Sequence, residues 1–205
     1  MLGRFDEAWA LARPAAERAR EFGGLHPGDP AQGDVELGGI AALAGDHATA
    51  AGHLRRECDR YERGGDRAHL STFAPELGRS LCALGRFDEA EPLARLGREL
   101  GGEQDFVTQM LWRQVQARVH AHRGQHAEAE RLAREAEAIG GRTDSLNRHG
   151  DALCDLAEVL AAAGRTDEAS ETLEQALERY ERKKNLAMLA QVRPQLEALR
   201  GAAPA

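Results

Sequence analysis

The sequence predicts an all-α fold: a right-handed α-solenoid of antiparallel helix pairs, about 40 residues per repeat, that ends in a C-terminal capping helix. Three observations predict it. A six-residue segment recurs five times at nearly constant spacing, and helical patterns of apolar residues lie beside it. The chain is also rich in alanine and only 4% aromatic. Small side chains favour close helix packing, whereas a large β-sheet core would need more Val, Ile, Tyr and Phe.

The recurring segment reads GRFDEA at Gly3, GDHATA at Gly45, GRFDEA at Gly85, GQHAEA at Gly124 and GRTDEA at Gly164. Successive glycines are 42, 40, 39 and 40 residues apart, and alanine is always the fifth residue after the glycine. Glycine tolerates the left-handed conformation that ends many helices. Each copy therefore predicts a tight turn between two helices.

The fifth copy shows the pattern on both sides of its turn. Apolar residues recur at helical spacing before Gly164, at Leu153, Leu156, Ala157 and Leu160. They recur again after it, at Leu173, Ala176, Leu177 and Tyr180. Thr166 is expected to be the N-cap of the second helix, because acidic residues that favour a helix N-terminus follow it.

The elements follow from this register. Second helices of the pairs are predicted at 5–20, 47–63, 87–100, 126–139 and 166–182. First helices are predicted at 34–44, 70–84, 106–123 and 146–163, and a capping helix at 185–200. One solenoid domain is therefore expected over residues 1–200, with a flexible tail at 201–205.

Proline and glycine mark the expected irregularities. Gly23–Gly33 is predicted to be a flexible loop, Pro14 and Pro92 to distort their helices, and Pro194 to kink or interrupt the capping helix. The chain begins two residues before the first turn glycine, so the first helix of the first repeat is missing from it. Either the chain is a piece of a longer protein, or a lone helix caps the N-terminus.

Small residues occupy the positions where paired helices must touch. Seven residues before the turn glycine lie Gly38, Gly78, Ala117 and Ala157. This pattern resembles the tetratricopeptide (TPR) repeat over almost the whole chain, although the usual unit is about 34 residues. The aromatic position after the turn is imperfect, with Phe5, His47, Phe87, His126 and Thr166. The resemblance implies a protein-interaction module.

One TPR subfamily grips the C-terminal carboxylates of chaperones with Lys and Asn at fixed positions. The corresponding residues here are Val35 and Gly39, Pro75 and Arg79, and Gln114 and Arg118. The clamp is not reproduced, so binding of chaperone tails is not expected.

Residues 70–200 carry a more specific resemblance. The segments VTQMLWRQVQARVHAHRGQHAEAERLAREA and GDALCDLAEVLAAAGRTDEASETLEQALERYERKKN are similar to the helical-repeat tails of large bacterial signalling proteins that carry an adenylate or guanylate cyclase domain and an AAA-type ATPase domain. The resemblance implies a regulatory tail, with the upstream catalytic domain of the same polypeptide as a possible partner. The phosphate-loop pattern GxxxxGK[ST] does not occur, so nucleotide chemistry is not expected of this chain.

Composition excludes several classes of function. The formal net charge is −7, and basic residues alternate with acidic ones, so no basic stripe predicts nucleic-acid binding. No apolar run predicts a signal peptide or a membrane span. Three widely spaced cysteines suggest reduced thiols and a cytoplasmic protein.

Histidines and cysteines could carry chemistry, but their placement argues against it. His120, His122 and His126 form HAHRGQH, yet the first two would point about 200° apart on a helix. No metal site is therefore expected. Cys82 and Cys154 lie among Leu and Ala, which predicts buried packing thiols rather than nucleophiles.

The acidic and aromatic residues can also be interpreted either as functional groups or as structural ones. Asp151, Asp155 and Glu158 are interpreted as a solvated acidic face rather than an acid/base pair, because a TPR groove is open. Trp9 and Trp112 are interpreted as core anchors or protected interface residues, with Trp112 half-buried. No catalytic residue, cofactor or metal is predicted.

The TPR register places first helices on the concave side of the solenoid, where a partner would bind. It predicts a groove that is basic in the middle repeats, at Arg79, Arg118 and His122, and acidic toward the C-terminus, at Asp151, Asp155 and Glu158. Such a groove would orient a protein or peptide of complementary charge. Ordinary solvated surface is the alternative. The sequence leaves two other functions open. The first is a small-molecule or peptide sensor, and the second, which is less favoured, is a metal-dependent enzyme.

Overall fold

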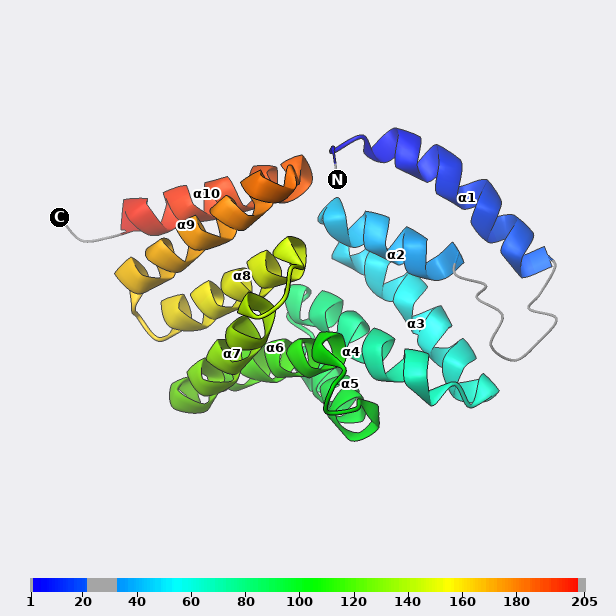
Figure 1. Ribbon diagram of the computed structural model, residues 1–205, viewed down its shortest axis with the longest axis horizontal. Helices are drawn as coiled ribbons and strands as arrows, with labels where there is room; N and C mark the ends of the chain where they lie inside the picture. The colour runs from blue at the N-terminus through cyan, green and yellow to red at the C-terminus, as the bar shows by residue number, and fades with distance from the viewer. Residues whose placement is uncertain (1, 22–32, 203–205) are drawn as a thin grey trace. The chain divides into compact units, whose positions relative to one another are not determined.

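The computed structural model describes residues 2–21 and 33–202, which form ten helices and no strand (Figure 1). The prediction of an all-α fold of antiparallel helix pairs is confirmed. The helices are α1 (Phe5–Glu21), α2 (Gly33–Leu43), α3 (His47–Gly64), α4 (Arg67–Ala83), α5 (Phe87–Leu100), α6 (Phe106–His122), α7 (His126–Gly141), α8 (Leu146–Ala162), α9 (Thr166–Lys183) and α10 (Leu186–Ala202).

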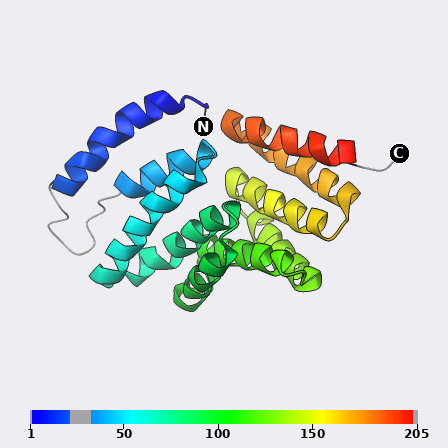
Figure 2. The ribbon, with the colours of Figure 1, turned by 180° about the vertical axis from the view of Figure 1, so that it is seen from behind.

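The chain divides into two compact units. One is Gly3–Gly101 and holds α1 to α5, and the other comprises Gly102–Ala205 with Met1–Leu2 and holds α6 to α10. Within each unit, every helix packs against the next one along the chain (Figures 1 and 2). A single continuous solenoid over residues 1–200 stays a prediction.

The five recurrent glycines form the predicted turns. All five have positive φ angles, between 72° at Gly85 and 80° at Gly45. After Gly45, Gly85, Gly124 and Gly164, the next residue donates its N–H to the carbonyl five residues earlier, as Arg165 does to Leu160 at 3.0 Å. This bond satisfies a carbonyl that the helix end would leave without a partner. Left-handed turns also follow α3 at Gly65 and α9 at Lys184, and the sequence interpretation missed both.

The helix N-termini differ in how they are capped. Asp46, Asp66 and Asp105 each accept a hydrogen bond from a backbone N–H three residues on. The prediction that Thr166 caps α9 is wrong, because the turn is one residue shorter than expected and α9 begins at Thr166 itself. Arg165 is the N-cap, and it makes no side-chain capping bond.

Proline does not interrupt the helices. Helices α1, α5 and α10 run continuously through Pro14, Pro92 and Pro194, so the expected interruption of α10 is wrong. All three proline side chains are exposed, so their rings face solvent and displace no packed neighbour. Helix α10 extends two residues beyond its predicted end, to Ala202, and residues 203–205 lie outside the described residues. The loop expected from residue 23 also lies outside them, apart from Gly33, which begins α2.

Small residues allow the paired helices to approach closely, as predicted. The alanines after four of the turns, Ala50, Ala90, Ala129 and Ala169, are all 0% exposed. A Cβ added at Gly38 would lie 3.0 Å from Cγ of Leu54 on the paired helix. The core of each unit therefore consists of helix seams in which small residues face larger ones.

Candidate functional site

The first helices α6 and α8 lie side by side in the second unit (Figures 1 and 2). Arg118 on α6 reaches across to α8, where its guanidinium lies 3.0 Å from Glu158 and 4.0 Å from Asp155. The Arg118 side chain is only 12% exposed, whereas the Glu158 side chain is 50% exposed. The structure thus brings together three of the six predicted groove residues, and it joins opposite charges that the sequence had placed in separate zones.

Asp151 and Asp155 are less solvated than the sequence suggested. Asp155 is 4% exposed, so the interpretation of this cluster as a solvated acidic face is wrong for that residue. Asp151 accepts a hydrogen bond from the hydroxyl of Tyr180 at 2.7 Å. Burial, and then the charge of Asp151, raises the pKa of Tyr180 well above its usual value. Both carboxylates therefore contribute to the α6–α8–α9 packing.

The remaining predicted groove residues are placed differently. His122 is exposed on the last turn of α6. Arg79 is half-buried on α4, in the other unit, so it is described apart from the α6–α8 residues. We call the surface formed by Arg118, His122, Asp151, Asp155 and Glu158 the α6–α8 face.

A polar cluster that the sequence interpretation missed joins α7, α8 and α9. His149 on α8 is 8% exposed, and its Nε2 lies 2.9 Å from the carboxylate of Glu137 on α7. Arg179 on α9 donates to Nδ1 of the same imidazole at 3.3 Å. The three side chains tie three helices together. Single-helix periodicity could not indicate them, because each helix supplies one member.

Trp112 is more buried than predicted. It is 7% exposed, its indole Nε1 donates to the Gln109 side chain at 3.1 Å, and the Arg113 guanidinium lies 4.1 Å from the ring centroid. Arg113 also donates to Glu135 on α7 at 2.9 Å. Trp112 is therefore a core anchor, and the prediction that it is half-buried is wrong.

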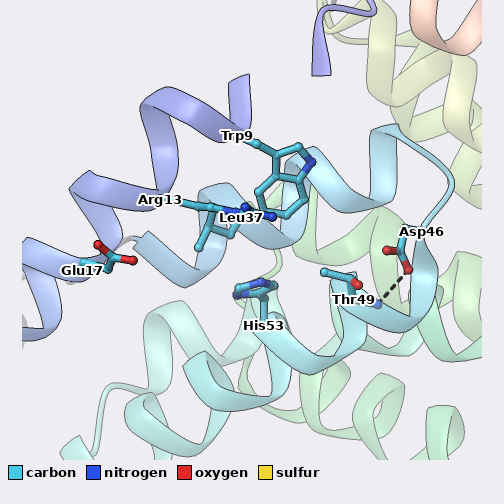
Figure 3. A pocket seen from close by; sticks show the side chains of 7 residues that line it. All are labelled: Trp9, Arg13, Glu17, Leu37, Asp46, Thr49 and His53. Carbon is cyan, nitrogen blue, oxygen red and sulfur yellow. Dashed lines mark hydrogen bonds between the residues drawn. The ribbon is translucent and has the colours of Figure 1, made fainter. Parts of the chain in front are cut away.

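A pocket of about 370 Å³ lies in the first unit, among α1, α2 and α3 (Figure 3). Its lining comprises Trp9, Arg13, Glu17, Leu37, Asp46, Thr49 and His53. The Arg13 guanidinium lies 5.0 Å from the Trp9 ring centroid, and the His53 ring lies 6.2 Å from the same ring. Hydrogen bonds from Thr49 hold the pKa of the Asp46 carboxyl below its usual value. The sequence interpretation missed this pocket because its residues come from three helices.

The three cysteines form no disulfide with one another. Cys58 and Cys82 are buried, and Cys154 is half-buried with its Sγ 3.7 Å from the Tyr180 hydroxyl. Burial raises the pKa of the Cys58 thiol to about 12. Within residues 2–21 and 33–202, no cluster of three or more His, Cys, Asp or Glu side chains could hold a metal ion. No described helix is long and apolar enough to cross a membrane.

Two segments of the chain match models of the tetratricopeptide repeat, residues 108–182 and residues 76–95. The first match covers α6 to α9 with the α6–α8 face. A search of curated protein sequences finds no match. Neither comparison shows the likeness to cyclase–ATPase tails.

A solved structure shows a similar fold. BtubC (BKLC) from P. vanneervenii aligns with a TM-score of 0.58 at 17% identity, covering 98% of this chain and 94% of that one. Nearly identical TPR-like repeats of a Podosopora anserina protein called a kinesin light chain align with a TM-score of 0.46 at 20% identity, covering 89% of this chain and 98% of that one. At 17% identity, the likeness to BtubC concerns the fold alone.

Proposed function

We propose that this chain is a non-catalytic, protein-binding TPR module that holds a segment of its partner on the α6–α8 face. The observation that carries the proposal is the adjacency of two first helices, α6 and α8, within the segment that matches the tetratricopeptide repeat. TPR repeats typically mediate protein–protein binding.

The chemistry of the face suits a partner segment that carries both signs of charge. Arg118 and Glu158 already form an ion pair across the two helices, and Glu158 and His122 extend to the surface. Arg118 is only 12% exposed, so it stays paired within the chain, and the exposed Glu158 and His122 are the groups that a partner's charges can reach. The partner's segment would be oriented by these charges rather than held by them alone.

The resemblance of residues 70–200 to cyclase–ATPase tails favours a partner domain within the same polypeptide of a bacterial signalling protein. The three cysteines form no disulfide with one another, which favours a cytoplasmic location for it.

Affinity capture with the full chain tests the proposed function. Proteins retained by the immobilised chain are identified by mass spectrometry, and each is then purified and titrated against the chain. His122→Glu, which replaces an exposed imidazole on the α6–α8 face with a carboxylate, should lower the affinity measured in this titration. The control Gln175→Glu, at an exposed position on the second helix α9, should leave it unchanged. Equal binding by both variants, or no specific partner at all, would contradict the proposal.

A small-ligand sensor is the second candidate, and the pocket of the first unit favours it. Trp9 offers an apolar platform, Arg13 offers a cation, and Glu17 and Asp46 offer carboxylates. The fitting ligand class is a small aromatic molecule that carries both a cationic and an anionic group. A thermal-shift screen with such compounds would detect it, because a ligand of the native state raises the melting temperature. Trp9→Ala should remove the shift, and a shift that persists in this variant would exclude the pocket.

A further inference from the structure

Arginine and glutamate recur at two fixed positions of the repeat. The tenth residue after the turn glycine is arginine in four of the five copies, namely Arg13, Arg55, Arg95 and Arg134. The fourth residue after the glycine is glutamate in four copies, namely Glu7, Glu89, Glu128 and Glu168. The exception at the fourth position is the copy at Gly45, which has Thr49 there.

These two positions meet between neighbouring second helices. The guanidinium of Arg55 on α3 lies 3.3 Å from the carboxylate of Glu89 on α5. The guanidinium of Arg134 on α7 lies 3.9 Å from the carboxylate of Glu168 on α9. In both places the arginine of one repeat therefore faces a carboxylate from the following repeat.

The same two positions line the pocket between α1 and α3, but the carboxylate is missing there. Arg13 and Thr49 both belong to the lining (Figure 3). The threonine side chain is shorter than glutamate and carries no charge, so space remains where the other junctions have a carboxylate. Among the side chains that the structure describes, Arg13 makes no ion pair, and its guanidinium lies 5.0 Å from the Trp9 ring centroid. The pocket of about 370 Å³ thus lies where the repeat omits its glutamate.

His53 does not give the pocket a second uncompensated cation. Its Nδ1 lies 2.5 Å from the carboxylate of Asp34, which is 7% exposed. Arg56 donates to the same carboxylate at 2.8 Å. The imidazole is therefore tied to a buried carboxylate, and its ring lies 6.2 Å from the Trp9 ring at a tilt of 41°. Arg13 is the cation that an anion in the pocket would meet.

Two carboxylates lie at opposite ends of the pocket, with Arg13 between them (Figure 3). Asp46 accepts a hydrogen bond from the backbone N–H of Thr49 at 3.0 Å and is the N-cap of α3. Glu17 is exposed and lies four residues after Arg13 on α1. A ligand whose anionic group sits at Arg13 therefore finds a carboxylate on either side for a cationic group.

We infer that Arg13 and Thr49 hold the carboxylate of a small ligand in the place of the omitted glutamate, and that this ligand is an aromatic α-amino acid. Its ring lies against Trp9 and His53, and its ammonium faces Glu17. A guanidinium binds a carboxylate through two parallel hydrogen bonds, and the threonine hydroxyl can donate a third. This inference rests on the small-ligand sensor proposed above and names the group that anchors its ligand.

The spacing on α1 favours an α-amino acid over longer molecules with both charges. Trp9, Arg13 and Glu17 follow one another at intervals of four residues, so they share one face of the helix. The Cβ atoms of such neighbours are about 5–6 Å apart. An α-amino acid carries its ammonium and carboxylate on one carbon, so its charges are close enough to meet Glu17 and Arg13 together. Its side chain then reaches the indole one turn earlier.

L-Phenylalanine is the probe, and isothermal titration calorimetry with the full chain measures its affinity. Saturable binding is expected. Phenethylamine, which keeps the ring and the ammonium but lacks the carboxylate, should bind at least about tenfold more weakly, because it forms no charge-assisted hydrogen bonds with Arg13.

Thr49→Glu is the deciding variant, because it restores the glutamate that the other copies carry. The new carboxylate should pair with Arg13 as Glu89 pairs with Arg55, and so lower the affinity for L-phenylalanine at least about tenfold. The matched control is Ala48→Glu, which adds the same charge at an exposed position outside the lining. This control should keep the affinity within about twofold, because solvent screens its charge. Both substitutions lie in the first turn of α3, where an acid suits the helix, so circular dichroism should show unchanged helix content.

The possible failures can be told apart. Equal affinities for L-phenylalanine and phenethylamine, or undiminished binding by Thr49→Glu, would overturn the inference while the pocket remained a ligand site. An equal loss of affinity in Thr49→Glu and Ala48→Glu would also overturn it, because charge alone would then explain the effect. No saturable binding of L-phenylalanine by the wild type would overturn it too, and the screen with Trp9→Ala would then decide whether the pocket binds another ligand. Protein binding by the α6–α8 face is scored separately with His122→Glu.

Discussion

Helices α4 and α5 approach each other closely at Gly97, and this contact makes a specific prediction about stability. A Cβ added there would lie 2.6 Å from Cγ of Pro75 and 3.0 Å from the carbonyl oxygen of Ser71. Neither neighbour can rotate away, because one belongs to a rigid ring and the other to the backbone. Gly97→Ala must therefore push the two helices apart.

The opposing effects can be sized. Replacing a helical glycine by alanine normally stabilises a helix by about 1 kcal/mol. Overpacking a tight seam costs about 1–3 kcal/mol, and the rigid neighbours of Gly97 place it at the upper end. We expect a net loss of about 2 kcal/mol for Gly97→Ala. The matched control is Gly52 in α3, where a Cβ would meet only the Arg56 guanidinium at 3.9 Å. Gly52→Ala should gain about 1 kcal/mol.

Urea unfolding followed by circular dichroism measures both changes from the shift in midpoint. Hydrogen exchange of peptides from α4 and α5 assigns the change to the first unit, because local stability differs between parts of a structure. The reasoning is refuted if Gly97→Ala is as stable as wild type, or if Gly52→Ala is destabilised to the same extent as Gly97→Ala.

Three further predictions concern buried polar groups. Tyr180→Phe should lower the free energy of unfolding by about 1.5–3 kcal/mol, because the hydroxyl donates to the Asp151 carboxylate. In an Asp151→Ala background the same substitution should cost less. An equal cost in both backgrounds would show that this hydrogen bond does not cause the loss of stability. Cys58 should react with an aromatic disulfide far more slowly in the native than in the unfolded protein, because burial raises its pKa to about 12; mass spectrometry of the labelled peptide measures this, and equal rates would contradict the burial. Burial raises the pKa of Tyr61 to about 12, and raises that of Tyr180 well above its usual value. The unfolded chain then releases these protons first, so stability should be fully present below pH 10 and decline above it; near-ultraviolet absorbance should show no tyrosine ionising at pH 10 in the native protein, and a step there would refute the assignment.

Local sequence was sufficient to predict the helices, and the physics of the turns explains why. Gly45 and Gly164 each allow a left-handed residue that ends one helix and starts the next, so the register of glycines sets most helix ends to within one or two residues. The turns at Gly65 and Lys184 were missed because they lie between pairs, where the sequence does not repeat. Gly65 directly follows Gly64, so the sequence does not show which of the two glycines forms the turn. The other turn is at Lys184, and lysine rarely adopts positive φ.

The arrangement of the candidate site could be predicted only in part. The TPR register placed Arg118 and Glu158 on first helices but in separate basic and acidic zones, and it did not predict that they pair across α6 and α8. Pairing depends on the offset between two helices, which no single helix encodes. The same limit applies to His149 and to the pocket around Trp9, whose partners come from other helices.

Helices α1 and α5 separate what local sequence determines from what it does not. Both begin with GRFDEA and both are helical from the phenylalanine onward, so the local pattern determines the secondary structure. Ala90 is nevertheless 0% exposed, while Ala8, at the same position of the repeat, is half-buried. The difference lies in the neighbouring helices, since α4 packs against α5 whereas α1 packs against α2 through Ala16. A repeat thus predicts where the helices lie and which residues are small, whereas the burial of each residue depends on which helix packs beside it.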